Sequence, residues 1–161
     1  MKIVMLTNTF MPHVGGVARS VAAFAAEYRR CGHQVLVVAP VFPNMPQAET
    51  GMVRIPAIQN FNGSDFSVVL PVSGLLTDEL DDFKPQIVHA HHPYLLGTTA
   101  LRIARYRELP LVYTHHTLIE QYTHYVPVDT PGIKRFAIEM GTRYANLADQ
   151  VFAPSESIAA L

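Results

Sequence analysis

The stretch Leu111-Val-Tyr-Thr-His-His-Thr117 places two adjacent histidines directly after a short apolar run. The chain repeats this arrangement in Ile87-Val-His-Ala-His-His-Pro93, where a second apolar run leads to His91 and His92. Short apolar runs of this kind are typical of parallel strands that are covered on both faces. We therefore predict that both histidine pairs stand at the carboxyl ends of parallel strands.

Predicted strands and helices alternate along the rest of the chain. Apolar runs predict strands at residues 2–6, 34–39, 53–55, 67–70, 87–90, 111–114 and 150–153. Apolar residues at helical spacing predict helices at 17–30, 75–83, 95–108 and 132–147, and another that begins at residue 156. Parallel strands need long crossover connections, and both faces of such a sheet need cover. The order therefore predicts a Rossmann-like α/β domain, a parallel sheet flanked by helices.

Composition narrows the classes of function. A chain of 161 residues is long enough for one domain with its own core. Its 12 basic and 13 acidic side chains leave a net charge of −1, so no overall positive field attracts nucleic acid. The single Cys31 excludes an internal disulfide and fits a reducing compartment. No apolar run has the length of a membrane span, and we expect a cytoplasmic protein that contacts a membrane only peripherally.

Ligands of such folds bind beyond the carboxyl ends of the strands, near the point where the strand order reverses. We expect four segments to converge there, at residues 7–16, 90–93, 114–117 and 154–155. Gly15 and Gly16 precede the first predicted helix, where backbone N–H groups and the helix dipole can bind an anion. The segment lacks the dinucleotide and Walker fingerprints, and a tight turn is the alternative explanation for the two glycines.

The two histidine clusters have two alternative interpretations. In the first, a metal-dependent hydrolase uses the four histidines His91, His92, His115 and His116. Neither cluster contains an Asp, Glu or Cys, which a catalytic metal site usually recruits. In the second, neutral imidazoles donate hydrogen bonds to hydroxyls or phosphoryl oxygens. His89, one residue short of the strand end, is predicted to point into the core.

Four segments in this order resemble the N-terminal domain of a GT-B glycosyltransferase of family 4. They are Gly15-Gly16, residues 88–93, residues 113–117 and residues 153–157. Within the family, residues 114–127 are similar to the bacterial diacylglycerol α-glucosyltransferases. The resemblance implies a retaining enzyme without a metal or other cofactor, which moves a sugar from a nucleotide-sugar donor such as UDP-glucose to a lipid or glycan acceptor.

The resemblance also implies roles for particular residues. Gly15 and Gly16 match the loop whose amides meet the donor diphosphate, and His116 matches the catalytic histidine under the transferred sugar. The positions implied for acceptor or donor-sugar binding are His92, His115, Glu120 and Tyr122. No carboxylate nucleophile stands beside His116, which favours a same-face reaction in which the leaving phosphate takes the acceptor proton.

The family's Glu-x7-Glu donor segment belongs to a second domain that this chain does not contain. We therefore expect residues 1–161 to fold but to be inactive without that C-terminal domain. Acceptor choice is expected in this half, through a lip with Phe61, Phe66 and Leu70 or through the basic helix at 132–147. The helix carries Lys134, Arg135 and Arg143 beside Phe136, which suits an anionic lipid surface or an ordinary solvated helix. A non-catalytic flavodoxin-like binding module remains the other alternative.

Overall fold

The computed structural model describes residues 1–13, 15–43, 45, 50–59, 67–69, 74, 76–116 and 131–159. The strands are β1 (Lys2–Leu6), β2 (Gln34–Pro40), β3 (Met52–Ile55), β4 (Ala57–Ile58), β5 (Val68–Val69), β6 (Ile87–Ala90), β7 (Leu111–Thr114) and β8 (Gln150–Phe152). The helices are α1 (Gly16–Arg30), α2 (Thr77–Phe83), α3 (Leu96–Tyr106), α4 (Pro131–Leu147) and α5 (Glu156–Ala159). The predicted alternation of strands and helices is confirmed.

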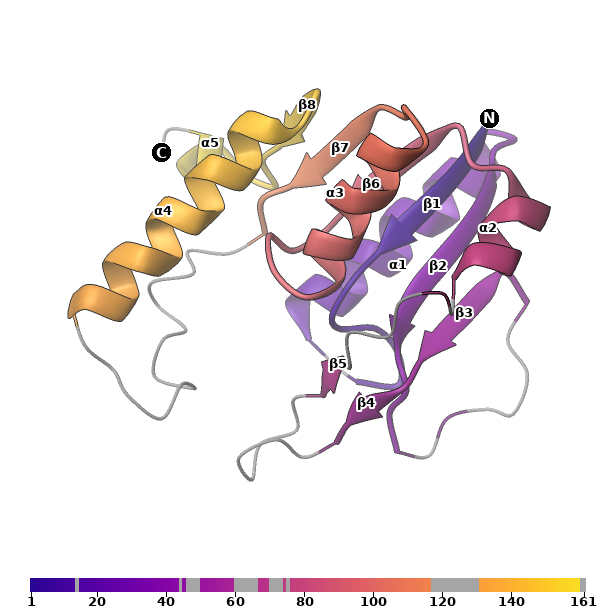
Figure 1. The fold of residues 1–161 in the computed structure, drawn as a ribbon, viewed down its shortest axis with the longest axis horizontal. Helices are drawn as coiled ribbons and strands as arrows, with labels where there is room; N and C mark the ends of the chain where they lie inside the picture. Colours follow the sequence, from indigo (N-terminus) through magenta and orange to yellow (C-terminus); the bar gives the residue numbers. More distant parts are fainter. Residues whose placement is uncertain are drawn as a thin grey trace.

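Six strands form one parallel sheet in the order β3-β2-β1-β6-β7-β8 (Figure 1). The chain first moves outward from β1 to β2 and β3, and then returns to the other side of β1 with β6. The strand order therefore reverses between β1 and β6. In a doubly wound sheet, this reversal separates the loops at the carboxyl ends of the two strands and opens a crevice between them.

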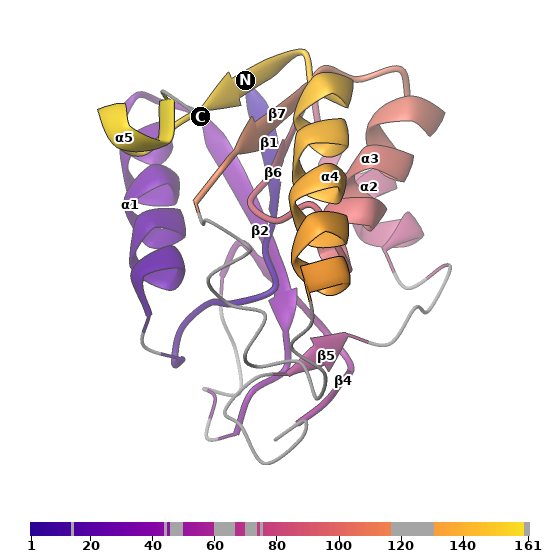
Figure 2. The ribbon, with the colours of Figure 1, turned by 90° about the vertical axis from the view of Figure 1, so that its left-hand side faces the viewer.

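Helices cover the sheet on two sides, with α1 and α5 on one side and α2, α3 and α4 on the other (Figure 2). Alternate residues of β1 supply the two cores, because successive side chains of a strand point to opposite faces. Ile3 and Met5 pack with Val21 of α1. Val4 and Leu6 pack in the second core, which also contains residues of α2, α3 and α4. Both faces of β1 are therefore buried, as its continuous apolar sequence predicts.

The apolar spacing of α1 determines which of its faces is buried. Ala18, Val21 and Ala25 lie three and four residues apart and are all buried against the sheet. The helix ends at Arg30, and its C-cap Cys31 is followed by Gly32, whose φ of +81° suits glycine. The N–H of Gly32 donates to Arg29 O at 3.0 Å, and the N–H of His33 donates to Tyr28 O at 3.0 Å. This pair of bonds satisfies carbonyls at the helix end.

Some predicted boundaries are wrong. β2 was expected to end before Pro40 but includes it. The proline is tolerated because β1 ends at Leu6, opposite Val38, so no strand on that side requires the missing N–H. The predicted strand at 67–70 is described only at Val68–Val69, which pairs with β4. The β4–β5 ladder was not predicted, because each strand has only two residues. Within the described residues, no helix is long and apolar enough to cross a membrane.

Candidate functional site

The loops after β1, β6 and β7 begin at the same level of the sheet. Leu6 pairs with Ala90, and Ala90 pairs with Tyr113, so the three strands end side by side. The N–H of His91 donates to Leu6 O at 3.1 Å, which continues the ladder one residue beyond β6. The predicted convergence is thus confirmed for the starts of the three loops after β1, β6 and β7, and this rim includes the point where the strand order reverses.

Asn8 ties two of these loops together. Its side-chain amide donates to Tyr94 O at 3.0 Å, and its Oδ1 accepts the N–H of Leu96 at 3.0 Å. Its own backbone N–H donates to Nδ1 of His92 at 3.2 Å. Asn8 is fully buried, and from the loop after the neighbouring strand β1 it caps the start of α3. Sequence reasoning missed this residue, although its place as a polar residue two positions after β1 was a usable signal.

His92 is a buried, neutral imidazole. Its side chain is largely enclosed, and burial, followed by the nearby His116, lowers its pKa to about 3. Because Nδ1 accepts the N–H of Asn8, the single proton of the neutral ring is on Nε2. His92 therefore holds the loop after β1 with one nitrogen and keeps a donor on the other.

His91 and His116 form a hydrogen-bonded pair. Nδ1 of His91 lies 2.8 Å from Nε2 of His116, and the two rings stack with centroids 5.1 Å apart. Burial and then His115 lower the pKa of His116 to about 4. Burial also lowers the pKa of His91, and neighbouring histidines add to the effect. Both rings are therefore neutral near pH 7, able to donate hydrogen bonds without bringing a positive charge.

His89 points into the interior, as predicted, and is fully buried. Its Nε2 lies 2.7 Å from Oγ1 of Thr114, and its Nδ1 lies 3.3 Å from the hydroxyl of Tyr28. Burial, with a smaller contribution from His116, lowers the pKa of His89 to about 3. The ring of His89 packs against that of His91, with centroids 4.1 Å apart, and so forms the buried end of the histidine cluster.

His115 faces a different environment from His116. Its Nδ1 lies 3.4 Å from the hydroxyl of Tyr113, which belongs to the core on the α3 side. His116 instead contacts His91, whose ring lies 5.9 Å from that of Phe24 on α1. Among the described residues, no three His, Cys, Asp or Glu side chains are grouped to hold a metal ion. The arrangement therefore does not support the four-histidine hydrolase.

The two glycines begin α1. Gly15 is its N-cap, and its carbonyl accepts the N–H of Arg19 at 3.0 Å. Gly15 has no side chain with which to cap α1, and the first turn has no acidic residue. A Cβ at Gly15 would lie 3.3 Å from Nε2 of His13, whereas one at Gly16 would have nothing within 4 Å. Packing within the described residues therefore does not explain Gly16.

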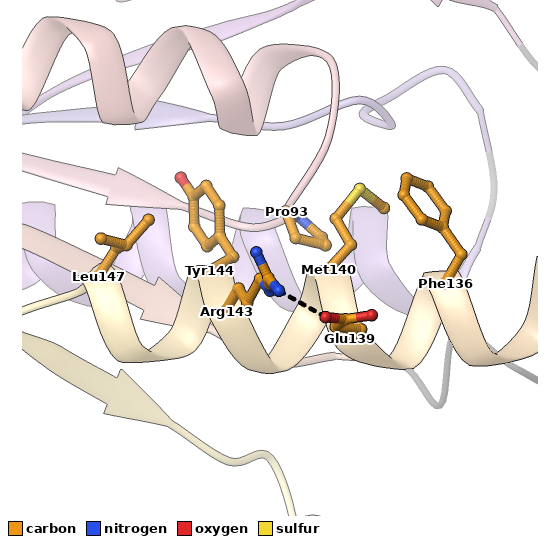
Figure 3. A pocket seen from close by; sticks show the side chains of 7 residues that line it. All are labelled: Pro93, Phe136, Glu139, Met140, Arg143, Tyr144 and Leu147. Atoms are coloured by element: carbon orange, nitrogen blue, oxygen red, sulfur yellow. Dashed lines mark hydrogen bonds and ion pairs between the residues drawn. The ribbon is translucent and has the colours of Figure 1, made fainter.

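A separate pocket of about 420 Å³ lies between α4 and Pro93, in the loop after β6 (Figure 3). Phe136, Met140 and Tyr144 line it along the helix. Arg143 and Glu139, also on α4, form an ion pair at 2.6 Å. The hydroxyl of Tyr144 donates to Gly97 O at 2.7 Å and fixes α4 to α3.

Part of the predicted site lies outside the described residues. Glu120 and Tyr122 fall there, and so do the three residues of the predicted acceptor lip, Phe61, Phe66 and Leu70. Of the remaining predicted residues, His92 and His116 stand at the shared rim with His91. Gly15 and Gly16 are at the start of α1.

Curated relatives match nearly the whole chain. It is 26% identical to an alpha-monoglucosyldiacylglycerol synthase of Streptococcus pneumoniae and 27% identical to one of Acholeplasma laidlawii, over 98% of the chain in each case. It is 29% identical to a GDP-mannose-dependent alpha-mannosyltransferase of Mycolicibacterium smegmatis, again over 98% of the chain. The chain spans 36%, 42% and 43% of these proteins, respectively.

Solved structures share the fold. A UDP-GlcNAc 2-epimerase from Neisseria meningitidis matches 99% of this chain with a TM-score of 0.56 at 18% identity, over 42% of its own chain. A ugt transferase from Siraitia grosvenorii matches 96% with a TM-score of 0.52 at 11% identity, over 44% of its own chain. With the parallel sheet and its flanking helices, these neighbours agree with the predicted N-terminal GT-B domain. The model of Glycosyltransferase Family 4 matches residues 14–161, and the chain therefore belongs to glycosyltransferase family 4.

Proposed function

We propose that residues 1–161 form the acceptor-side domain of a retaining enzyme that moves glucose from UDP-glucose to a diacylglycerol-type lipid. The observation that carries this proposal is the neutral His91–His116 pair at the strand-order reversal. Neutral imidazole donors in a partly enclosed site suit the hydroxyls and phosphoryl oxygens of a nucleotide sugar.

The start of α1 is the proposed contact for the donor diphosphate. The N-cap Gly15 offers no side chain that would compete for its first amides, and no carboxylate in the first turn repels an anion. Gly16 leaves open the space that a Cβ would occupy, so phosphate oxygens can approach the backbone closely. We assign the remaining donor contacts, and the cationic groups that offset the diphosphate charge, to a second domain. The chain spans about two fifths of the relatives, and we expect it to be inactive alone.

His116 is the proposed catalytic residue, donating a hydrogen bond beside the reacting carbon of the sugar. Within the described part of the chain, no carboxylate hydrogen-bonds to His91, His92 or His116. A double displacement through a carboxylate nucleophile is therefore not favoured by these residues. We propose that the acceptor hydroxyl attacks from the face that the leaving phosphate occupies, and that this phosphate takes its proton.

The lipid acceptor is proposed from the relatives named as alpha-monoglucosyldiacylglycerol synthases, and from the surface of α4. Phe136 on α4 is 66% exposed, and Arg135 next to it is also exposed. An exposed aromatic ring beside a basic group suits the surface of an anionic membrane. We therefore place the protein at the cytoplasmic face of a membrane, with His115, Glu120 and Tyr122 on the acceptor side.

A second donor has specific support. The relative of Mycolicibacterium smegmatis is named for its dependence on GDP-mannose, and its identity to this chain is 29%. The test therefore compares tritiated UDP-glucose and GDP-mannose, using the full-length gene product and vesicles of anionic phospholipid that contain diacylglycerol. We expect glucose in the lipid fraction. Transfer of mannose alone would show that the donor is GDP-mannose. No transfer from either donor by a correctly folded protein would refute the proposed sugar transfer to diacylglycerol.

The same assay tests the assignment of His116. We expect His116→Ala to lose about a hundredfold or more in kcat, the usual loss for a donor aimed at developing charge. His33→Ala is the matched control, because His33 follows α1 at the opposite end of the strands. The assignment of His116 fails if both variants keep the activity of the unmodified enzyme.

A further inference from the structure

His91 is held more rigidly than any of the roles assigned so far requires. Its backbone N–H extends the β6 ladder to Leu6, and its side chain is 1% exposed. The rings of His89 and Phe24 contact it at centroid distances of 4.1 Å and 5.9 Å. A ring enclosed in this way cannot itself reach a substrate, so its effect must pass through the group that it contacts at the rim.

That group is His116, and the hydrogen bond between the two rings has a definite direction. Nε2 of His91 is buried and has no hydrogen-bond partner among the described residues, whereas Nδ1 lies 2.8 Å from Nε2 of His116. If His91 carried its proton on Nε2, a buried N–H would be left without an acceptor, which is rare and costly in folded proteins. If it carries the proton on Nδ1, that proton donates to His116 and only a lone pair remains unused.

We propose that His91 is a positioning residue whose Nδ1–H donates to Nε2 of His116 and thereby holds the proton of His116 on Nδ1. The lone pair of His116 is then occupied, and among the described residues its Nδ1–H has no other partner. His116 therefore offers a hydrogen-bond donor and is not a free base. This role in sugar transfer rests on the proposed function, whereas the tautomer of the pair does not.

The rest of the cluster supports this direction. The hydroxyl groups of Thr114 and Tyr28 occupy both nitrogens of His89, and the N–H of Asn8 occupies Nδ1 of His92. Neither histidine is therefore in a position to supply an acceptor for Nε2 of His91, which is without a partner in the described part of the chain.

Nitrogen-15 NMR of the histidine rings tests the proposal on the 161-residue chain, without an activity measurement. Long-range proton–nitrogen correlation distinguishes a protonated from an unprotonated ring nitrogen. We expect His116 to show protonated Nδ1 and unprotonated Nε2. Protonated Nε2 on His116 would overturn the proposal, whatever the activity of the full-length enzyme.

Two variants of the same residue sharpen the test. The amide nitrogen of Asn in His91→Asn stands near the place of Nδ1, whereas that of Gln in His91→Gln stands near the place of Nε2. We expect the tautomer of His116 to survive in His91→Asn and to become mixed in His91→Gln. In the full-length enzyme, His91→Gln should lose about tenfold in kcat with KM nearly unchanged, and His91→Asn should retain most of the rate. Equal behaviour of the two folded variants would refute the role of His91. A normal tautomer without sugar transfer would instead refute the proposed function.

Discussion

Replacing Asn8 by alanine should destabilise the fold strongly, because this side chain joins two loops from the interior. Asn8→Ala removes the bonds to Tyr94 O and from Leu96 N–H, both 3.0 Å long. Asn8 is fully buried, its bond from Leu96 N–H is buried, and its bond to Tyr94 O is partly buried. Each polar group left unsatisfied costs about 1–3 kcal/mol, so for the two groups we expect the free energy of unfolding to fall by about 2–6 kcal/mol.

Urea denaturation followed by far-ultraviolet circular dichroism measures this loss. Asn146→Ala is the matched control, because Asn146 is exposed on α4 and its replacement should change the free energy of unfolding by less than about 0.5 kcal/mol. A loss below 0.5 kcal/mol in Asn8→Ala, indistinguishable from the control, would show that the loops are not held by this side chain.

Three further perturbations test other parts of the structure. A Cβ in Gly97→Ala would overlap the carbonyl oxygen of His92, so we expect a loss of at least about 3 kcal/mol or failure to fold, checked by thermal denaturation. His89 and His92 have pKa values near 3 in the folded chain and near 6.5 when unfolded, so the unfolded state binds more protons between these values. The free energy of unfolding should therefore be highest above pH 6.5, and it should fall by about 1.4 kcal/mol per pH unit for each of these histidines as the pH drops toward 3. Equal unfolding midpoints at pH 7 and pH 5 would contradict this. Finally, Phe136→Ala with Arg135→Ala should weaken sedimentation with anionic vesicles by about tenfold and leave stability nearly unchanged, whereas unaltered sedimentation would remove α4 from the membrane contact.

The order of the elements could be predicted from local patterns. The apolar runs at β1, β6 and β7 and the helical spacing in α1 are properties of neighbouring residues, and they survive in the tertiary structure. Boundaries were less predictable where a distant strand decides them. Pro40 remains in β2 because β1 has already ended, a fact that no residue near Pro40 reveals. The ladder of β4 with β5 was missed for the same reason, because its bonds join segments that are too short to show a pattern.

The same distinction between local patterns and contacts of distant segments applies to the candidate site. Strand ends and histidine pairs could be recognised in the sequence, because the carboxyl edge of a parallel sheet is set by the direction of the chain. The sequence pattern did not reveal that His91 would be the buried partner of His116, or that His115 would turn toward Tyr113. Nor did it reveal Asn8 as the residue that joins the loops.

By itself, the sequence determined a wound parallel sheet and the positions along the chain at which polar residues follow the ends of its strands. It could do so because hydrophobic periodicity is a local property. Only the tertiary structure decided which of those residues meet, which nitrogen of each histidine is occupied and which rings stay neutral. These properties depend on neighbours that lie 25 positions away in the case of His91 and His116, and on the water that packing excludes from around them.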